Sequence, residues 1–230
     1  MLKIGAIIQA RMSSQRLPGK VLHEVNGKPL IQYILERLEQ CSIIKEFVIA
    51  TSREKSDDQI EEFCRKNQGS CYRGSLNDVA SRFKEILEKE RWDAFVRVNG
   101  DSPLIDQHLI DQGVNLFIDG DFDLVTNVFP RSYPSGQSVE IVRTSTFKKI
   151  YSQMNNSDDF EHVTKFFYRN PEEFKIFNFT SLTDYHSVHL SVDTIQDMQV
   201  FSSIIKRMTR PHWDYHLEEV LGMYREICTN

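Results

Sequence analysis

The stretch KIGAIIQARMSSQRLPGK (residues 3–20) joins an apolar run to a cationic, polar segment, and its pattern indicates the fold class. The run 3–9 is too continuously apolar for a strand with one solvated face, so it predicts a strand that is buried on both sides, as in a parallel sheet. The segment after it combines Arg11, Arg16 and Lys20 with serines, amides, a proline and a glycine. Loops that follow the strands of an open parallel sheet are where ligands bind. We therefore expect a ligand-binding loop here.

Downstream of this stretch, short apolar runs alternate with longer segments of helical period. We expect strands at 46–51, 94–98 and 123–127, and helices at 29–40, 77–90 and 105–118. Asn77 is the expected N-cap of the second of these helices. Alternating strands and helices predict βαβ units, whose right-handed crossovers place helices on both faces of a mainly parallel sheet.

The second half of the chain is less regular. We expect strands at 138–142, 174–179 and 186–192, and helices at 144–154, 159–169, 194–208 and 214–227. Thr194 and Asp197 predict a variant of the capping box at the start of one of these helices. No repeat, low-complexity tract or Gly/Ser-rich linker marks a boundary. The expectation is therefore a single α/β domain over residues 1–230 with an added C-terminal portion.

The composition excludes several classes of protein. Hydrophobic residues make up 40% and charged residues 27% of the chain, which is ordinary for a folded globular protein and argues against disorder. No apolar run approaches the roughly 18 residues of a membrane span, and no signal peptide is evident, so we expect a cytoplasmic protein with no membrane partner. The four cysteines form no C-x-x-C pair and are expected to be reduced and mostly buried.

The charge is unevenly distributed. Residues 1–30 contain five cationic side chains and one carboxylate, a net charge of +4, although the whole chain has a net charge of −5. An acidic chain is a poor candidate for binding long nucleic acid by counterion release, whereas a small cationic loop suits one small polyanion. On charge alone, the alternative of a solvated surface loop stays open.

The loop has the donors that phosphate requires. Arg11 and Arg16 offer planar, bidentate hydrogen bonds to phosphate oxygens, and Lys20 offers a movable point charge. Ser14 and the backbone N–H groups around it would complete a cradle. The stretch contains neither G-x-x-x-x-G-K-[ST] nor G-x-G-x-x-G, so it is neither a P-loop nor a dinucleotide fingerprint.

Two aspartates are candidate metal ligands. Asp101 lies in RVNGDSPLID (97–106), at the carboxyl end of an expected strand, and Asp193 lies in LSVDTIQDMQVF (190–201), directly before an expected helix. A carboxylate facing phosphate-binding cations suggests Mg²⁺ between the two. The alternatives are that Asp101 only caps its turn and that Asp193 only caps its helix.

Six segments of the chain resemble one enzyme family, in order and over nearly the whole length. The first, IIQARMSSQRLPGKVL with GKPLIQYILERL (7–38), resembles the start of the cytidylyltransferases that activate sugar acids, the CMP-ketodeoxyoctonate and CMP-sialate synthetases, and is most similar to their spore-coat polysaccharide branch. The likeness continues through RGSLNDVASRF (73–83), VNGDSPLID (98–106), YPSGQSVEIV (133–142), EHVTKFF (161–167) and SVDTIQDM (191–198).

The resemblance implies a nucleotidyltransferase domain of the nucleotide-diphospho-sugar transferase type, a GT-A, Rossmann-like fold, with CTP and a small sugar as substrates, Mg²⁺ as cofactor and a homodimer as the usual assembly. It implies that Lys20, Asp101 and Arg11 are catalytic and that Asp101 and Asp193 hold the metal. The implied nucleotide-binding residues are Arg11, Ser14, Arg16, Lys20, Asp78 and Arg82. The implied sugar-binding residues are Asn99, Glu140, Glu161 and His162, although His162 could equally be a packed or surface histidine.

The expected reaction is attack by a sugar hydroxyl on the α-phosphorus of CTP, which forms a CMP-sugar and releases pyrophosphate. The leading acceptor is a nonulosonic or related sugar acid, for a cell-surface or spore-coat polysaccharide. Gln9 and Ser102 depart from the pattern of the better-known sugar-acid enzymes, which carry Pro and an acidic residue there, and this leaves the acceptor sugar open.

Two other functions compete with this one. A glycosyltransferase of the same fold would use a D-x-D metal site, for which FIDGDFD (117–123) offers Asp119, Asp121 and Asp123, although this stretch also has the composition of an exposed turn. A non-catalytic nucleotide-binding protein would keep the cationic loop, but it would tolerate loss of Asp101 and Asp193.

Overall fold

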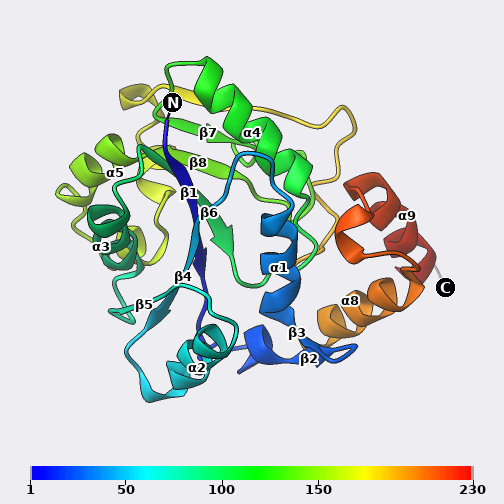
Figure 1. The fold of residues 1–230 in the computed structure, drawn as a ribbon. Helices are drawn as coiled ribbons and strands as arrows, with labels where there is room; N and C mark the ends of the chain where they lie inside the picture. The colour runs from blue at the N-terminus through cyan, green and yellow to red at the C-terminus, as the bar shows by residue number, and fades with distance from the viewer. Residues whose placement is uncertain (1, 229–230) are drawn as a thin grey trace.

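The computed structural model describes residues 2–228, and its centre is a seven-stranded sheet with the order β5-β4-β1-β6-β8-β7-β9 (Figure 1). The strands are β1 Ile4–Gln9, β4 Phe47–Ser52, β5 Cys71–Gly74, β6 Ala94–Asn99, β7 Leu124–Thr126, β8 Glu140–Arg143 and β9 Ile176–Asn178. Strand β8 is antiparallel to both of its neighbours, and the other pairings in the sheet are parallel. A separate small hairpin joins β2 Glu24–Val25 to β3 Lys28–Pro29. The mainly parallel α/β fold is therefore confirmed.

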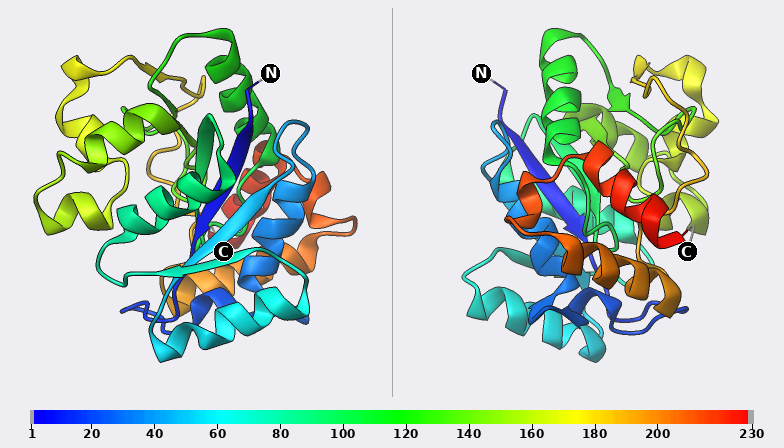
Figure 2. Two further views of the ribbon diagram at one scale, coloured as in Figure 1. Left: turned by 60° about the vertical axis from the view of Figure 1, so that its left-hand side comes forward. Right: turned by 90° about the vertical axis from the view of Figure 1, so that its right-hand side faces the viewer.

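Helices cover both faces of the sheet (Figures 1 and 2). They are α1 Leu30–Glu39, α2 Asp58–Lys66, α3 Val79–Glu90, α4 Gln107–Asp119, α5 Thr144–Tyr151, α6 Ser157–Glu161, α7 Lys165–Arg169, α8 Ile195–Arg207 and α9 Leu217–Cys228. Successive residues of β1 contribute to two separate cores, Ala6 and Ile8 to the core under α1 and α4, and Ile7 to the core under α3 and α5. This double burial explains why the run 3–9 is apolar without alternation.

The C-terminal portion is an extension that packs on α1. Helices α8 and α9 lie against each other, and a 3₁₀ turn at His212–Asp214 joins them and contacts α1. The expected capping box is present at the start of α8, where Thr194 accepts a hydrogen bond from the backbone of Asp197 and the Asp197 carboxylate accepts one from the backbone of Thr194.

Several local expectations are wrong. Segment 186–192 is not a strand but an extended segment with one isolated bridge, because Leu190 and Val192 donate to the carbonyls of the loop residues Ser135 and Asp101. The helix expected at 159–169 is two short helices, broken after Glu161. The N-cap of α3 is Asp78 rather than Asn77, since the Asp78 carboxylate accepts the hydrogen bond from the N–H of Ser81.

Strand β5 and helix α2 were not expected. Strand β5 has only one fully buried residue, so it lacks the apolar pattern of a buried strand. Helix α2 does have an apolar stripe of Ile60, Phe63 and Cys64 at helical spacing, but the helix is only nine residues long and the stripe lies among charged residues. The cysteines are free thiols, but only Cys41 and Cys64 are fully buried. Within residues 2–228, none of the helices combines the length and apolarity needed to cross a bilayer.

Candidate active site

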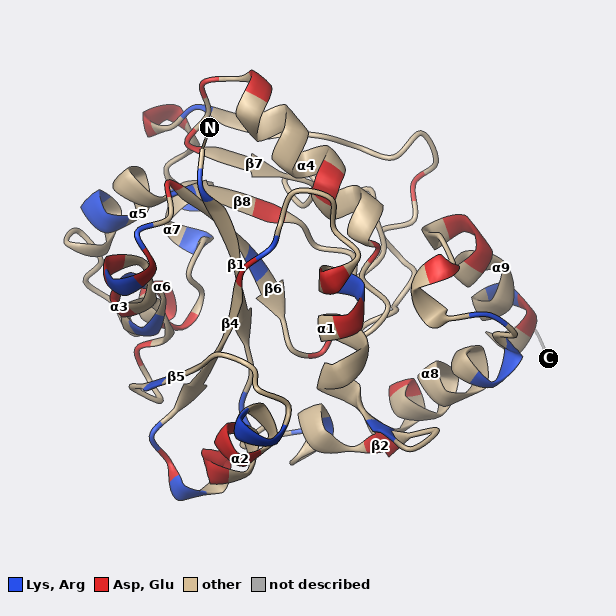
Figure 3. Cartoon of the chain, viewed as in Figure 1, with Lys and Arg blue, Asp and Glu red and all other residues tan. Residues whose placement is uncertain are grey.

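A cavity of about 420 Å³ lies beyond the carboxyl ends of β1 and β6. The loop after β1 and the turn after β6 form two of its sides. The first turn of α3, the end of α6 with the break after it, and Asp193, two residues before α8, complete it. It brings together ten of the twelve expected site residues, namely Arg11, Ser14, Arg16, Lys20, Arg82, Asn99, Asp101, Glu161, His162 and Asp193. Charged residues of both signs are spread over the helices and loops elsewhere on the chain (Figure 3).

Backbone contacts fix the cationic loop. The N–H of Gly19 donates to the carbonyl of Met12 (2.8 Å), and Gly19 has a φ of +75°, which only glycine adopts without strain. The fully buried Asp57 accepts hydrogen bonds from the N–H groups of Met12 (2.7 Å) and Ser52 (3.0 Å), so its carboxylate ties the loop to the end of β4. The loop is therefore held in place independently of any ligand.

The two candidate metal ligands converge on one cation. The ammonium of Lys20 lies 3.2 Å from Asp101 Oδ2 and 2.9 Å from Asp193 Oδ1, and it also donates to the carbonyl of Val192 at 2.7 Å. The N–H of Val192 in turn donates to the carbonyl of Asp101 at 2.8 Å, which brings the two segments side by side. Arg16 forms a second ion pair with Asp193 at 3.0 Å. Lys20 is only 7% exposed, whereas the side chains of Asp101 and Arg16 are 29% and 64% exposed, so the cluster has a buried centre and a solvated rim.

Two further cations face the cavity. Arg11 forms an ion pair with Glu161 at 2.8 Å. Arg82 is 2% exposed and donates to the carbonyl of Ala50 at 3.3 Å, and among residues 2–228 its Nε has no hydrogen-bond partner. Burial lowers the pKa of Arg82, and the nearby charge of Arg11 lowers it further. A buried guanidinium that is poorly satisfied by protein atoms can bind an anionic ligand strongly.

A second cavity of about 320 Å³ shares Asn99 and His162 with the first. Its wall contains the buried Glu140, which pairs with Arg97 at 2.6 Å and accepts a hydrogen bond from Tyr168. Burial alone would raise the pKa of Glu140, but the charge of Arg97 and hydrogen bonds from Tyr168, Thr164 and Arg97 lower it below its ordinary value. Glu140 is therefore a fixed carboxylate in the second cavity rather than the first.

Arg131 contributes an unneutralised charge to the second cavity. Its guanidinium donates to the carbonyl of Pro134 (3.2 Å) and to the hydroxyl of Ser138 (2.9 Å). Among residues 2–228, no carboxylate lies within ion-pair distance of it. Burial lowers the pKa of Arg131, an effect that the charge of Glu140 partly opposes.

Asp78 does not line either of these two cavities. Its carboxylate accepts hydrogen bonds from the N–H of Ser81 (2.7 Å) and the hydroxyl of Tyr151 (2.8 Å), so it caps α3 and fixes α5 against it. Arg82 lies one turn further along the same helix. Asp78 therefore affects the cavity indirectly, because it fixes the start of the helix that carries Arg82.

The acidic stretch 117–123 lies at the opposite edge of the sheet. Asp123 directly precedes β7, which runs parallel to β6, so it is at the end where these strands begin. Asp121 pairs with Arg143 and Lys175 there. A D-x-D metal site at this position would be separated from the cavity by the length of the sheet.

Three residues that shape the site were not expected from the sequence: Asp57, which holds the loop after β1, and Arg97 and Arg131, which line the second cavity. Arg97 could have been found, because it is the only charged residue in an otherwise apolar strand and must there be paired with a carboxylate. Asp57 and Arg131 gave no such signal, because each lies in a polar stretch where charged residues are ordinary.

Comparison with known proteins agrees with this geometry. A family model described as cytidylyltransferase matches residues 5–220. A cytidylyltransferase structure from Leptospira borgpetersenii is 31% identical and superposes with a TM-score of 0.94 over 100% of this chain and 96% of that one. The spore coat polysaccharide biosynthesis protein SpsF of Bacillus subtilis is 28% identical over 87% of this chain and 85% of its own length.

A more distant structure shares the fold. A CMP:2-keto-3-deoxy-manno-octonic acid synthetase complexed with CTP is 19% identical and has a TM-score of 0.67, over 89% of this chain and 99% of that one. The family model covers nearly all of the chain, including the cationic loop and both aspartates. The protein is therefore a member of the cytidylyltransferase family.

Proposed function

We propose that this protein transfers CMP from CTP to an acidic sugar with release of pyrophosphate. The observation that carries the proposal is the convergence of Asp101 and Asp193 on one cation, in a cavity that also presents Arg11, Arg16 and Arg82. A triphosphate with a divalent cation has the charge distribution that such a set of side chains complements.

In this proposal the cations of the cavity bind the triphosphate. Arg11, Arg16 and Lys20 each have a carboxylate partner in the absence of substrate, so they would exchange that partner for phosphate oxygens. Arg82 needs no exchange, because no carboxylate within residues 2–228 pairs with it. Ser14 lines the same cavity and supplies a further hydroxyl donor. Asp78 would act indirectly, by fixing the helix that carries Arg82.

Asp101 and Asp193 would hold Mg²⁺. Carboxylate oxygens are the ligands that Mg²⁺ prefers, and the two side chains already surround a positive charge, the Lys20 ammonium. When bound, Mg²⁺ supplies neutralisation of the charge on the phosphate oxygens.

The residues of the chain then align the two substrates. The acceptor hydroxyl oxygen forms a bond to the α-phosphorus, the bond from that phosphorus to the bridging oxygen breaks, pyrophosphate leaves, and the hydroxyl proton is released. Such a displacement depends on alignment and on neutralisation of developing charge more than on covalent help. Arg11 and Lys20 would provide that neutralisation.

The second cavity is the proposed acceptor site. Its position next to Asn99 and His162 would bring a sugar hydroxyl close to the triphosphate, and the buried Asn99 Oδ1 lacks a partner that a sugar hydroxyl would supply. Arg131 suits the carboxylate of a nonulosonic or related sugar acid, because a guanidinium binds a carboxylate in a bidentate manner. Glu140, together with His162 at the shared edge and Glu161 in the first cavity, would bind sugar hydroxyls.

We further propose that the protein is a homodimer and that its product feeds a cell-surface or spore-coat polysaccharide. Similarity to SpsF over most of both chains supports the pathway class. Sedimentation analysis of the purified protein tests the assembly.

The deciding experiment is a pyrophosphate-release screen that crosses four NTPs with sugar acids and neutral sugars. We expect activity with CTP and a sugar acid, and a loss of roughly 10²–10³-fold in Asp101→Asn, because a neutral amide binds Mg²⁺ poorly and the charge on the phosphate oxygens would then be less well neutralised. Asp119→Asn is the matched control, since Asp119 is exposed at the end of α4 and belongs to the rival D-x-D stretch. A normal rate in Asp101→Asn, or a loss in Asp119→Asn instead, would overturn the proposal.

The acceptor assignment has its own test. Arg131→Gln should raise the KM for the sugar acid at least tenfold, because it removes the charge that would pair with the sugar carboxylate. It should leave the affinity for CTP unchanged, because Arg131 lines the second cavity and the cations that would bind the triphosphate line the first. Lys20→Ala should do the reverse and weaken CTP binding. If Arg131→Gln left the KM for the sugar acid unchanged, the carboxylate would have to bind elsewhere.

A further inference from the structure

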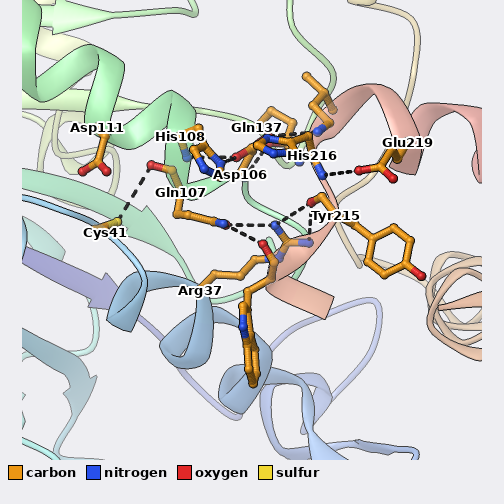
Figure 4. A network of polar contacts seen from close by, with 12 residues as sticks. Arg37, Cys41, Asp106, Gln107, His108, Asp111, Gln137, Tyr215, His216 and Glu219 are labelled. Atoms are coloured by element: carbon orange, nitrogen blue, oxygen red, sulfur yellow. Dashed lines mark hydrogen bonds and ion pairs between the residues drawn. The ribbon is translucent and has the colours of Figure 1, made fainter. Parts of the chain in front are cut away.

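A second cluster of metal-binding side chains lies outside both cavities, where the N-termini of α4 and α9 meet. Asp106, His108 and His216 converge there, and one donor atom of each lies within 4.8 Å of the other two (Figure 4). His108 Nδ1 is 2.9 Å from Asp106 Oδ1, and His216 Nδ1 is 4.0 Å from Asp106 Oδ2. The two imidazole rings face each other with centroids 4.2 Å apart. The chain segments involved are more than a hundred residues apart in the sequence.

The carboxylate of this cluster is fixed before any ligand binds. The Asp106 side chain is 5% exposed and accepts hydrogen bonds from the N–H groups of His108 and Leu217, both at 2.9 Å. The side-chain oxygen of Gln137 holds the backbone N–H of Asp106. Each carboxylate oxygen still has a lone pair for a further partner. Both imidazoles are more than half exposed, so a dissolved ion can reach them and water can complete its shell.

We propose that Asp106, His108 and His216 bind a zinc-like divalent transition-metal ion. Two imidazole nitrogens and one carboxylate oxygen form a donor set typical of Zn²⁺, whereas Mg²⁺ prefers oxygen ligands alone. Bonds of about 2.1 Å in tetrahedral geometry place two donors about 3.4 Å apart. The two imidazoles lie nearest to different oxygens of Asp106, and one donor atom of each residue lies within 4.8 Å of the other two, so shifts of at most about 1.4 Å bring the three donors to that spacing. The exposed rings can make such shifts without disturbing the core.

The proposed ion would act as a structural clamp. Asp106 ends the loop that begins with Asp101, while α9 packs on α8, the helix that follows Asp193. An ion bound at Asp106, His108 and His216 would therefore connect the loop that carries Asp101 to α9. Through α9 it would also stabilise α8, the helix that follows Asp193. The two helix N-termini that meet here disfavour a cation, and the buried negative charge of Asp106 offsets that effect.

The test is metal binding to the full-length protein, stripped with EDTA and kept in excess Mg²⁺ so that the carboxylates of the cavity do not take up the probe ion. Zn²⁺ should bind at one saturable site by calorimetry and raise the melting temperature by roughly 5 °C or more at a hundredfold excess over Kd. Co²⁺ should give the intense visible absorption of a tetrahedral nitrogen- and oxygen-ligated ion.

His108→Gln and His216→Gln should each abolish the Co²⁺ spectrum and the Zn²⁺-dependent rise in melting temperature, with an unchanged melting temperature in EDTA. His186→Gln is the matched control, because His186 Nδ1 lies 2.9 Å from Asp184 but is not part of such a three-residue cluster. Equal Zn²⁺ binding by wild type and by the double variant His108→Gln/His216→Gln would overturn the proposal. So would the absence of saturable binding to the wild type.

Discussion

Two arginine side chains, Arg37 and Arg82, are almost completely buried, and their surroundings differ. The terminal nitrogens of Arg37 donate to Gln107 Oε1 (3.1 Å) and to the carbonyl of Tyr215 (3.3 Å) (Figure 4). They also donate to the carbonyl of His212 (2.6 Å), so Arg37 joins α1, α4 and the C-terminal portion. Within residues 2–228, Arg82 makes a single hydrogen bond, with the carbonyl of Ala50, and the Nε of both arginines lacks a partner. Arg37 is thus a buried charge that stabilises the fold, whereas the guanidinium of Arg82 has hydrogen-bond donors left for a ligand.

The largest expected effect on stability is at Arg37. Arg37→Met should lower the free energy of unfolding by about 3 kcal/mol, because it leaves three buried oxygens without their donor. Chemical denaturation measures this change, with the nucleotide affinity of the folded variant as the second readout. We expect that affinity to be nearly unchanged. A variant as stable as the wild type would show that the contacts of Arg37 are not what holds the C-terminal portion.

The same region should make stability depend on pH. Burial lowers the pKa of His212 to about 4, although the hydrogen bond with Glu36 opposes this effect. In the unfolded chain this histidine has an ordinary pKa near 6.5, so as the pH falls it is protonated there before it is protonated in the folded protein. The stability that neutral His212 contributes is therefore complete above pH 6.5 and falls by about 2–3 kcal/mol as the pH approaches 4.

Glu36 also makes the protein less stable as the pH falls. Hydrogen bonds from Lys28 and His212 stabilise its carboxylate in the folded state and lower its pKa, so protonation of Glu36 at low pH costs stability. His212→Gln keeps a donor for Glu36 but does not titrate, so denaturation curves between pH 4.5 and 7.5 should show a shallower pH dependence than the wild type. An identical dependence in both proteins would assign the effect to other groups.

Arg82 should show the opposite behaviour to Arg37. Arg82→Met should weaken CTP binding by roughly 10- to 100-fold, the loss of one charge-assisted contact, while the free energy of unfolding changes by less than about 1 kcal/mol. Calorimetric titration with CTP and denaturation measure the two quantities. Lys84→Met, on the outer face of the same helix, is the control. A variant that loses stability but keeps its affinity would make Arg82 a structural residue like Arg37.

The contrast between these regions also shows what the sequence could predict. The loop after β1 could be predicted because its signal is local, an apolar strand followed within a few residues by cations and a glycine. The position of Asp101 followed from the same rule for β6. The break between α6 and α7 places Glu161 and His162 in the cavity, but it has no local signal and was expected to be a continuous helix.

Long-range pairings account for most of what could not be predicted. The insertion of the antiparallel β8 between β6 and β7 depends on hydrogen bonds between strands distant in the sequence. That insertion places Glu140 beside Arg97, and nothing in the sequence of either strand indicates that the two strands pair. The partners of Arg37 are of the same kind, since two of the three are backbone carbonyls near the C-terminus. Backbone carbonyls are present at every residue, so composition cannot identify them.

The smallest effect that still tests the comparison is at Asp78, which fixes the helix carrying Arg82. Asp78→Ala should lower the free energy of unfolding by about 1 kcal/mol, the usual value of a lost N-cap, and should weaken CTP binding less than Arg82→Met does. Tyr151→Phe removes only the hydroxyl that donates to Asp78 and should cost about half as much. If Asp78→Ala weakened CTP binding as strongly as Arg82→Met with no loss of stability, Asp78 would have to contact the nucleotide itself. The start of α3 would then belong to the binding surface, and capping would be secondary.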